Sequence, residues 1–578
     1  MKGLQGTGAK TQIGANCKHF IANSLEGGTG SGINRHNFDA RVSLEDLHDY
    51  YLPPFEACTR HAMGTMCSYN ALNGVPTCAN EWLLKDVLRK EWNFTGYIVS
   101  DCGALADIYD GHHYATGPTQ ASAQAMNATV DLNCGDGVVY PKGLLEAFAE
   151  GLVQEKTIRE SFARLARIQF RLGLFDPKDF DPNQDIKTVG SHGDLAFEAA
   201  LQSIVLLQNR NSILPLDPSL KLAVIGPHIN STAALLSNYH GNKCGCGPSR
   251  GFSCLETPLQ ALTAMASGSV TGITGCHVAQ DDLNEIDKAT KAAKESDAVI
   301  LLVGLDQSQE SEGKDRAQMT LPGLQPDLIE AVLRVASEKT ILVLLHGGSV
   351  SLGESIRAHT PAIISASYGG EAASKALASV LFGEYNPTGK LAATMYPPSF
   401  GDELPITEMG LRVGVGRTHL YYKGAPEFPF GHGLSYSQWE LYWSDSQNDM
   451  TLELTGDAPS IRVSITIRNS GPYTGGQTVL LFWRPATPSA NVRQKLIGFQ
   501  GAQDMVVGEE RVVDFEVSRD AFSMWNSRSN STEVLAGKYL LEARASGSKL
   551  TRTLLVKRTS ISLQNIAQLT RMTYYLRP

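Results

Sequence analysis

The stretch Asn93-Phe-Thr-Gly-Tyr-Ile-Val-Ser-Asp-Cys-Gly-Ala-Leu105 decides how the fold of this chain is interpreted. Its run Tyr97–Val99 is aromatic and β-branched, which predicts a buried strand. Asp101 comes two residues after that run, at the carboxyl end of the strand. Loops at this end of barrels and open α/β sheets gather catalytic residues, but an Asp here can also cap the next helix. The spacing leaves both roles open.

The length and composition indicate several globular domains. A chain of 578 residues exceeds one ordinary domain, and three units are expected. Hydrophobic residues make up 42% of the chain, enough for sizeable cores, and the net charge is a mild −9. No basic cluster indicates nucleic acid, and no apolar run of about 20 residues indicates a membrane span. The first residues, Met1–Gly6, lack the apolar region of a signal peptide.

The cysteines favour an oxidising compartment. All ten lie between Cys17 and Cys276, and their number is even. Four Asn-x-Ser/Thr sequons accompany them, at Asn93, Asn127, Asn230 and Asn530. Together these features predict an extracellular glycoprotein. Cys244-Gly-Cys246, with Cys254 and Cys276, lacks the paired CxxC spacing of a zinc site, so we predict disulfides or free thiols there and no metal.

Residues 1–185 alternate short strands with helical segments such as Leu44–Arg60 and Glu81–Lys90. The candidate strands are Gln12–Phe20, Thr65–Asn70, Tyr97–Asp101 and Val130–Cys134. This alternation predicts a parallel sheet or a (β/α) barrel. A closed TIM-type barrel needs eight strands in about 250 residues, and only about four are counted here. The pattern therefore predicts an open sheet or the C-terminal part of a barrel.

A second α/β domain is predicted over residues 186–410, after a linker rich in Asp and Pro at Phe175–Gln184. It begins with an amphipathic helix at His192–Gln208 and contains another at Leu324–Ser337. Continuous apolar runs predict strands covered on both faces, as in a mostly parallel sheet. These runs are Lys221–Gly226, Ala298–Leu305, Thr340–His346 and Ala362–Tyr368.

The last part of the chain changes to a period of two. We predict a linker at 411–450, a fibronectin type III-like antiparallel β-sandwich at 451–558 and a tail at 559–578. Apolar residues alternate with polar ones from Ile461 to Arg468, and Asn469-Ser-Gly471 follows as a turn. Further strands are predicted at Val479–Trp483, Arg511–Val517, Lys538–Ala545 and Leu550–Lys557.

Three polar segments are candidates for chemistry. Lys18-His19 ends the first predicted strand, where a cation and an imidazole can hold sugar hydroxyls or a phosphate; a surface pair is the alternative. Gly28-Thr-Gly-Ser-Gly32 lacks the strand and Lys-Ser/Thr of a phosphate-binding loop, so it predicts a flexible loop. The acid-rich loop Asp306–Arg316 follows a buried strand. It is either a solvated charge run or the source of a second carboxylate to pair with Asp101, as glycoside hydrolysis requires.

Five motifs in order resemble glycoside hydrolase family 3. They are Cys17-Lys-His-Phe20, Met66-Cys-Ser-Tyr-Asn70 with Asn73-Gly-Val-Pro76, Tyr97-Ile-Val-Ser-Asp-Cys102, Glu310-Ser-Glu-Gly-Lys-Asp-Arg316 and Phe428-Pro-Phe-Gly-His-Gly-Leu-Ser-Tyr436. The helix Leu195–Asn209 and the pair Gly389-Lys390 also match. The resemblance spans nearly the whole chain, and it implies a (β/α) barrel, an α/β sandwich and a fibronectin-like domain.

The resemblance also implies roles for residues. Asp101 matches the nucleophile of a retaining mechanism that needs no cofactor. Glu312 matches the Glu-Gly that carries the acid/base, with Glu310 as the alternative, and such an acid is expected to have a raised pKa. Three further residues match positions that line the sugar subsite next to the scissile bond, namely Lys18, His19 and Tyr69.

Cys102 distinguishes groups within the family. Members resembling β-glucosidases usually carry Trp after the nucleophile, whereas those resembling β-xylosidases and α-L-arabinofuranosidases usually carry Cys. Residues Val130–Cys134, Gln169–Phe175 and Cys244–Cys254 are also similar to the second group. The resemblance therefore implies a pentose-containing oligosaccharide or aryl glycoside as substrate, with glucose as the alternative, and a Cys102–Cys134 disulfide near the pocket.

The chain departs from the family at two places. Ser24 stands where the family has Asp, and the family carries a long further segment before the position of Met1, including the first barrel strands. The resemblance implies an N-terminally truncated chain. A non-catalytic remnant is therefore the competing hypothesis, since half a barrel leaves sheet edges open. A carbohydrate-binding module lacks an aromatic platform in the sequence, and the oligomeric state is not predicted.

Overall fold

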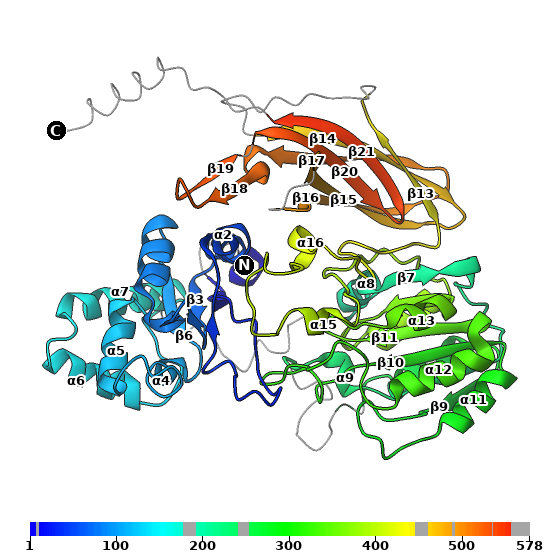
Figure 1. Ribbon diagram of the computed structural model, residues 1–578, viewed down its shortest axis with the longest axis horizontal. Helices are drawn as coiled ribbons and strands as arrows, with labels where there is room; N and C mark the ends of the chain where they lie inside the picture. The colour runs from blue at the N-terminus through cyan, green and yellow to red at the C-terminus, as the bar shows by residue number, and fades with distance from the viewer. Residues whose placement is uncertain are drawn as a thin grey trace.

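The computed structural model describes residues 1–6, 11–176, 192–240, 252, 254–445, 460–487, 492–534 and 536–556. Two α/β domains lie side by side, and a β-sandwich lies across them (Figure 1). Among the described residues, no helix has both the length and the apolar character needed to cross a bilayer. Most of the predicted linker Phe175–Gln184 and the whole predicted tail 559–578 lie outside the described residues.

The N-terminal domain is built on a three-stranded parallel sheet. Its order is β1-β3-β6, formed by Asn16–Phe20, Gly64–Cys67 and Tyr97–Ser100. The prediction of a fourth strand at Val130–Cys134 is wrong, because this segment pairs with β6 as a strand at one isolated bridge, between Leu132 and Val99, and its other contacts with β6 include that of the Asp131 side chain. Its polar end instead turns toward Ser100, whose Oγ accepts from the Cys134 N–H at 3.0 Å.

Helices and disulfides surround this sheet. The helical segments are α2 (Leu44–Asp46), η1 (Leu47–Tyr51), α3 (Leu52–Thr59), η3 (Trp82–Glu91), α4 (Ala104–Asp107), α5 (Pro118–Asn127), α6 (Leu144–Ala149) and α7 (Glu155–Arg171). The helical predictions near Leu44–Arg60 and Glu81–Lys90 are thereby confirmed. Disulfides join Cys17 to Cys58, Cys67 to Cys78 and Cys102 to Cys134, and the last pair confirms the predicted crosslink.

The central domain contains a six-stranded sheet with the order β7-β12-β11-β10-β8-β9. Its strands are β7 (Val205–Asn209), β8 (Leu222–Ile225), β9 (Val270–Ile273), β10 (Ala298–Gly304), β11 (Thr340–Leu345) and β12 (Ala362–Ser365). All pairings are parallel except that of β7 with β12. The four predicted apolar runs form its centre, whereas β9 was not predicted because its residues are half-exposed.

The prediction of one helix over His192–Gln208, also part of the matched helix Leu195–Asn209, is wrong from Ile204 onward. The helix α8 (Gly193–Ser203) ends early, and β7 follows it directly. Leu206 packs into the core on one face of the sheet, whereas Val205 and Leu207 pack into the core on the other. This alternation is that of a strand, and pairing with β12 outweighs the helical spacing of the apolar residues.

Helices cover both faces of the central sheet (Figure 1). One face carries α8, α10 (Pro258–Met265) and α14 (Ala373–Leu381), and α14 contacts both of the others. The other face carries α11 (Ile286–Glu295), α12 (Gln325–Ala336) and α13 (Gly353–His359). Every residue of β10 is buried, as the continuous apolar run predicted. The acid-rich loop that follows β10 therefore starts from a rigid, fully covered strand.

The C-terminal domain is an antiparallel sandwich of two sheets. One sheet contains β13 (Gln438–Trp443), β14 (Ser460–Gly471) and β17 (Glu510–Ser518). The other contains β16 (Lys495–Met505), β15 (Gly475–Pro485), β20 (Gly537–Ala545) and β21 (Ser548–Val556). Val463, Ile465 and Ile467 are buried as their alternation predicted. The strand β13 lies inside the segment 411–450 that we interpreted as a linker, and its pairing with β14 makes it part of the sandwich.

One ion-pair cluster joins the three domains. Arg412 pairs with the carboxylates of Asp46 and Asp49, at 2.6 Å for Asp49, and both carboxylates belong to the N-terminal domain. Asp49 also accepts a hydrogen bond from the Trp525 N–H of the sandwich at 2.8 Å. The two carboxylate side chains are only 3% and 7% exposed, so Arg412 is their main source of positive charge. The Tyr51 hydroxyl adds a hydrogen bond to the Met409 carbonyl.

We expect Arg412→Met to lower the free energy of unfolding by about 3–5 kcal/mol, because it leaves two buried carboxylates without their cation. Denaturant unfolding followed by tryptophan fluorescence measures this loss. The matched control is Arg462→Met on β14, whose ion pair with Asp514 lies on the surface and contributes little. Equal loss in the two variants would contradict the structural role of the cluster.

Candidate active site

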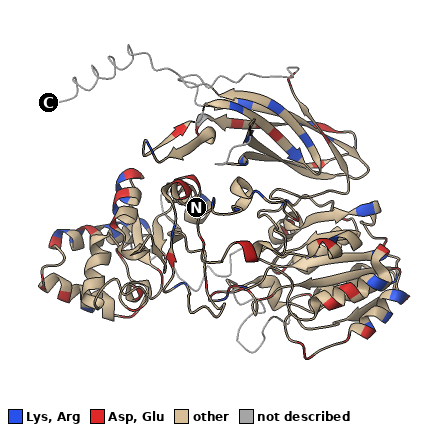
Figure 2. Ribbon diagram, in the orientation of Figure 1, with Lys and Arg blue, Asp and Glu red and all other residues tan. Residues whose placement is uncertain are grey.

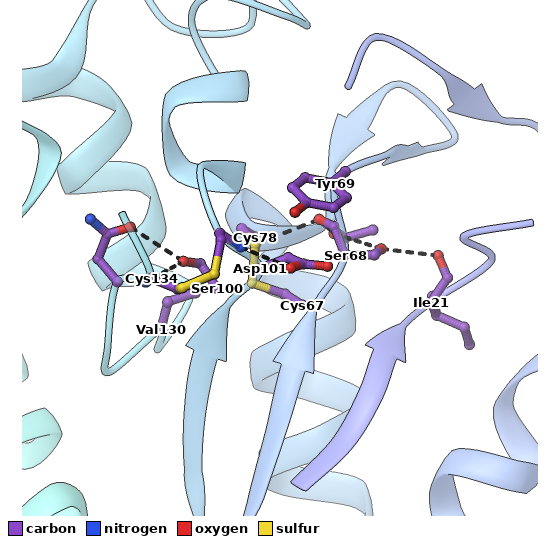
Figure 3. Close-up of a disulfide and its surroundings, with 12 residues drawn as sticks. Ile21, Cys67, Ser68, Tyr69, Cys78, Ser100, Asp101, Val130 and Cys134 are labelled. Atoms are coloured by element: carbon purple, nitrogen blue, oxygen red, sulfur yellow. Dashed lines mark hydrogen bonds between the residues drawn. A yellow bond between two sulfur atoms is a disulfide. The ribbon is translucent and has the colours of Figure 1, made fainter. Parts of the chain in front are cut away.

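The carboxyl ends of β1, β3 and β6 meet at one edge of the N-terminal sheet because the strands are parallel. Lys18 and His19 lie near the end of β1, Tyr69 follows β3 and Asp101 directly follows β6. Figure 3 shows Tyr69 and Asp101 together at this edge, beside the Cys67–Cys78 disulfide and near Cys134. The structure therefore brings the four predicted residues of this domain together.

Asp101 is buried at the end of its strand, with an exposed fraction of 7%. Its Oδ1 accepts a hydrogen bond from the Cys102 N–H at 2.8 Å, and its own N–H donates to the Cys67 carbonyl at 3.0 Å. Among the described residues its Oδ2 has no hydrogen-bond partner, and it lies 3.4 Å from His19 Nε2. The helix α4 that follows has no side-chain cap, so the helix-cap alternative is wrong. The carboxylate instead presents one unoccupied oxygen to the site.

Burial and the charge of Asp101 act on the pKa values of His19 and Tyr69. Burial lowers the pKa of His19, while the negative charge of Asp101 acts in the opposite direction. Burial and then the charge of Asp101 raise the pKa of the Tyr69 hydroxyl. At neutral pH the site therefore combines a neutral phenol and a largely neutral imidazole with the carboxylate. Both side chains can donate hydrogen bonds to a neutral, hydroxyl-rich ligand and accept hydrogen bonds from it.

Glu312 reaches the same site from the central domain. Its Oε1 accepts from Arg35 Nη1 at 2.7 Å, and its Oε2 accepts from the Tyr239 hydroxyl at 3.3 Å. The Lys18 ammonium lies 4.6 Å from the centre of the Tyr239 ring. The hydrogen bond from Arg35 lowers the pKa of Glu312, so the expectation of a raised pKa is wrong for the protein without ligand. Glu312 remains 43% exposed, which leaves it accessible to solvent and ligand.

Glu310 is instead held within the central domain. Its carboxylate accepts from the N–H groups of Gly347 and Gly348, at 2.6 and 3.0 Å, and from the Tyr368 hydroxyl at 2.7 Å. The guanidinium of Arg316 lies 3.6 Å away. Three donors and one cation therefore occupy this side chain. Of the two glutamates, it is the charge of Glu312 that acts on His19 and Tyr69 beside Asp101.

The loops of the two domains are joined by further hydrogen bonds. Asp315 Oδ2 accepts from the N–H groups of Glu26 and Gly27, both at 2.7 Å, and the Asp315 N–H donates to the Gly27 carbonyl. The Gly313 N–H donates to Glu26 Oε2 at 2.9 Å, and Arg35 pairs with the same carboxylate at 3.1 Å. These contacts hold the acid-rich loop over the end of the N-terminal sheet. We call them the interdomain clasp.

The glycine-rich loop Gly28–Gly32 lies next to this clasp. Gly28 has a φ of 83°, and a Cβ atom there would lie 3.2 Å from the Gly313 carbonyl oxygen. Glycine at this position therefore permits close approach of the two backbones. The sequence predicted a flexible loop and no phosphate site, but its contact with the central domain had no signal in the sequence. Arg35, Glu26 and Tyr239 were missed for the same reason.

The cysteines bear on two predictions, the Cys102–Cys134 disulfide and the choice between thiols, disulfides and a metal site. Cys102 is bonded to Cys134, so its sulfur reaches the site as part of a crosslink. Within the described part of the chain, no group of three or more His, Cys, Asp or Glu side chains could hold a metal ion. Cys254 is disulfide-bonded and Cys276 is a buried free thiol, whereas Cys244 and Cys246 lie outside the described residues.

Three family models match successive parts of the chain. The glycosyl hydrolase family 3 N-terminal domain matches residues 1–168, the family 3 C-terminal domain matches 204–436, and a fibronectin type III-like domain matches 477–547. A probable exo-1,4-beta-xylosidase from Neosartorya fischeri is 35% identical over 562 residues, which cover 92% of this chain and 70% of that protein.

Solved structures show the same architecture. An exo-beta-xylosidase in complex with a xylobiose aziridine activity-based probe has a TM-score of 0.87 and 27% identity, covering 96% of this chain and 74% of that one. A beta-glucosidase from Listeria innocua in complex with glucose has a TM-score of 0.81 and 25% identity, covering 97% and 77%. The fold is therefore common to proteins named for different sugars.

We expect Arg35→Met to raise the pKa of Glu312, because the variant removes the guanidinium that stabilises the ionised carboxylate. The carboxyl group would then keep its proton to a higher pH, and carbon-13 NMR of the labelled glutamates follows this titration. The control is Arg41→Met, which breaks the exposed pair with Asp39 on a neighbouring segment and leaves Glu312 unaffected. An unchanged Glu312 titration in Arg35→Met would contradict this assignment.

Proposed function

Because the chain belongs to glycoside hydrolase family 3, we propose that it is a retaining exo-β-glycosidase that removes sugars from non-reducing ends. The observation that carries this proposal is the geometry of Asp101, a buried carboxylate with one unoccupied oxygen at the end of a strand. A second carboxylate, Glu312, approaches the same site from another domain. Paired carboxylates are what a retaining glycosidase uses.

Asp101 is the proposed nucleophile. Its Oδ2 attacks the anomeric carbon and forms a covalent glycosyl ester, while the bond from that carbon to the leaving oxygen breaks. Glu312 gives its proton to the leaving oxygen and then, as a carboxylate, takes a proton from the water that hydrolyses the ester. Arg35 stabilises the ionised form of Glu312, which is the form that the second step needs.

Lys18, His19 and Tyr69 are the proposed ligands of the sugar hydroxyls. They surround Asp101 at the sheet edge, and they offer donors and acceptors of one ammonium, one imidazole and one phenol. Hydrogen bonds to the hydroxyls would orient the anomeric carbon toward Oδ2. Such positioning lowers the barrier by removing the need to align the reactants during the reaction.

The proposed substrate is a β-1,4-linked xyloside, with α-L-arabinofuranosides as a second substrate, as in the breakdown of xylan and hemicellulose. The relatives named as xylosidases support this choice, together with Cys102 directly after the nucleophile. A β-glucosidase is the alternative, supported by the likeness to the Listeria protein. Secretion is also proposed, because disulfides such as those of Cys17, Cys67 and Cys102 persist best in an oxidising compartment.

A non-catalytic protein that keeps the family fold is the second candidate. One observation favours it: large apolar side chains are exposed on α6 and α7 of the N-terminal domain. Leu145, Phe162 and Phe170 are 67%, 70% and 65% exposed. Exposed apolar side chains of this kind are usual at contact sites and in proteins that aggregate. Aggregation would disturb the N-terminal sheet that carries Asp101.

The test is hydrolysis of aryl β-xyloside, aryl β-glucoside and aryl α-L-arabinofuranoside. We expect turnover with the highest kcat/KM for the β-xyloside and a product that retains its anomeric configuration, as NMR shows directly. Preference for the glucoside would support the β-glucosidase alternative. A folded protein that hydrolyses none of the three would favour the non-catalytic candidate.

We expect Asp101→Ala to lower kcat by at least about 10³-fold, as removal of a nucleophile does in other covalent mechanisms. Added azide should restore turnover in Glu312→Ala, because a small nucleophile attacks the glycosyl ester without help from a base. The control is Glu310→Gln, which should retain turnover if Glu310 is structural. Full activity of Asp101→Ala would contradict the assigned nucleophile.

A further inference from the structure

A polar cavity lies on the sandwich, and no residue of the candidate active site lines it. Its volume is about 550 Å³, within the usual range for small-ligand sites. The cavity is bounded by the ends of β15, β20 and β21 and by the segment after α16 (Thr418–Tyr421). Figure 2 shows basic residues among the strands of this domain.

The lining is strongly cationic. The lining contains one acidic side chain, Glu542, and five basic ones: Lys423, Arg484, Arg493, Arg544 and Lys549. Glu542 is only 1% exposed, and it is shared by Arg544, by Lys549 at 2.5 Å and by Arg484 at 3.4 Å. A single carboxylate thus serves three of the five cations.

The other two cations bind neutral groups. Arg493 Nη1 donates to the carbonyls of Tyr422 and Gly424, at 2.7 and 3.0 Å, and Lys423 Nζ donates to the Gly414 carbonyl at 3.0 Å. Carbonyl oxygens carry no full charge, so the cavity keeps an excess of positive charge. Like charges that share one cavity repel each other, and an anion placed among them would relieve this repulsion.

The remaining walls favour an anion that is part of a larger organic molecule. Pro485 contributes half-buried apolar surface, against which the C–H face of a sugar ring can pack, whereas Tyr421 and Val492 are almost fully buried beside it. The cavity is also far larger than the roughly 30 Å³ that a water-sized ligand occupies. Guanidinium groups match the planar geometry of a carboxylate and bind it through two parallel hydrogen bonds.

From these observations we propose that this cavity binds a uronic acid residue of an acidic glycan, apart from the candidate active site. The choice of a glycan rests on the proposed function, whereas the choice of a carboxylate rests on the charges of the cavity. The site would retain an acidic polysaccharide on the sandwich while the N-terminal and central domains act on a terminal sugar.

Binding of tetragalacturonate to the whole chain, measured by isothermal titration calorimetry, tests this proposal without requiring turnover. We expect it to bind at least about tenfold more tightly than its fully methyl-esterified form, which has the same length and no charge. Added salt should weaken the binding of the acid, because the charges are screened. Equal affinity for the two forms would overturn the proposal. So would binding of inorganic phosphate as tight as that of the tetramer.

The double variant Lys423→Gln/Arg484→Gln should lower the affinity for tetragalacturonate by about tenfold and leave aryl glycoside hydrolysis unchanged. The matched control is Arg468→Gln/Arg511→Gln, which removes the same charge from β14 and β17 outside the cavity. Circular dichroism checks the folding of both variants, and the comparison of acid with ester in the unaltered chain stands independently of them. Equal loss in both variants would show attraction to overall charge and refute the site.

Discussion

The interdomain clasp is the constraint on which the candidate site depends. Asp315 binds the backbone N–H groups of Glu26 and Gly27, and Arg35 binds Glu312, so the central domain contributes a carboxylate to a site built on the N-terminal sheet. Hydrogen bonds in which one partner is charged are stronger than neutral ones. The cluster around Arg412 joins the same domains at the sandwich. Two separate contacts therefore limit the movement of Glu312 relative to Asp101.

The electrostatics of the site follow from this arrangement. Asp101 lies in a buried position where its charge acts on His19 and Tyr69, whereas Glu312 is exposed and paired with a guanidinium. The two carboxylates thus occupy different environments, as two groups with different roles must. In the protein without ligand, the environment of Glu312 favours its ionised form. The proposed acid role of Glu312 therefore requires its contact with Arg35 to weaken when the proposed substrate binds.

The sequence predicts those parts of the site that lie at the ends of predicted strands. Asp101 and His19 could be predicted as candidates because each lies at the carboxyl end of such a strand, whereas Tyr69 was predicted only through the resemblance to the family. Arg35 and Tyr239 could not, since each meets Glu312 through folding of distant segments and neither lies in a recognisable motif. The lowered pKa of Glu312 was missed because it depends on Arg35. In the fold, the predicted helix His192–Gln208 includes β7 because an apolar run that is buried on both faces of a sheet can also show helical spacing.

Cys102 acts on the site through its backbone. Its N–H binds Asp101 Oδ1, and its sulfur is bonded to Cys134, whose own N–H binds Ser100 at the end of the same strand. The disulfide therefore fixes the donor that occupies one carboxylate oxygen. With Oδ1 held in this way, the other oxygen is directed toward His19 Nε2, 3.4 Å away, and has no hydrogen-bond partner among the described residues. The backbone N–H of the residue after the acid thus fixes the orientation of the carboxylate and directs its Oδ2 toward His19.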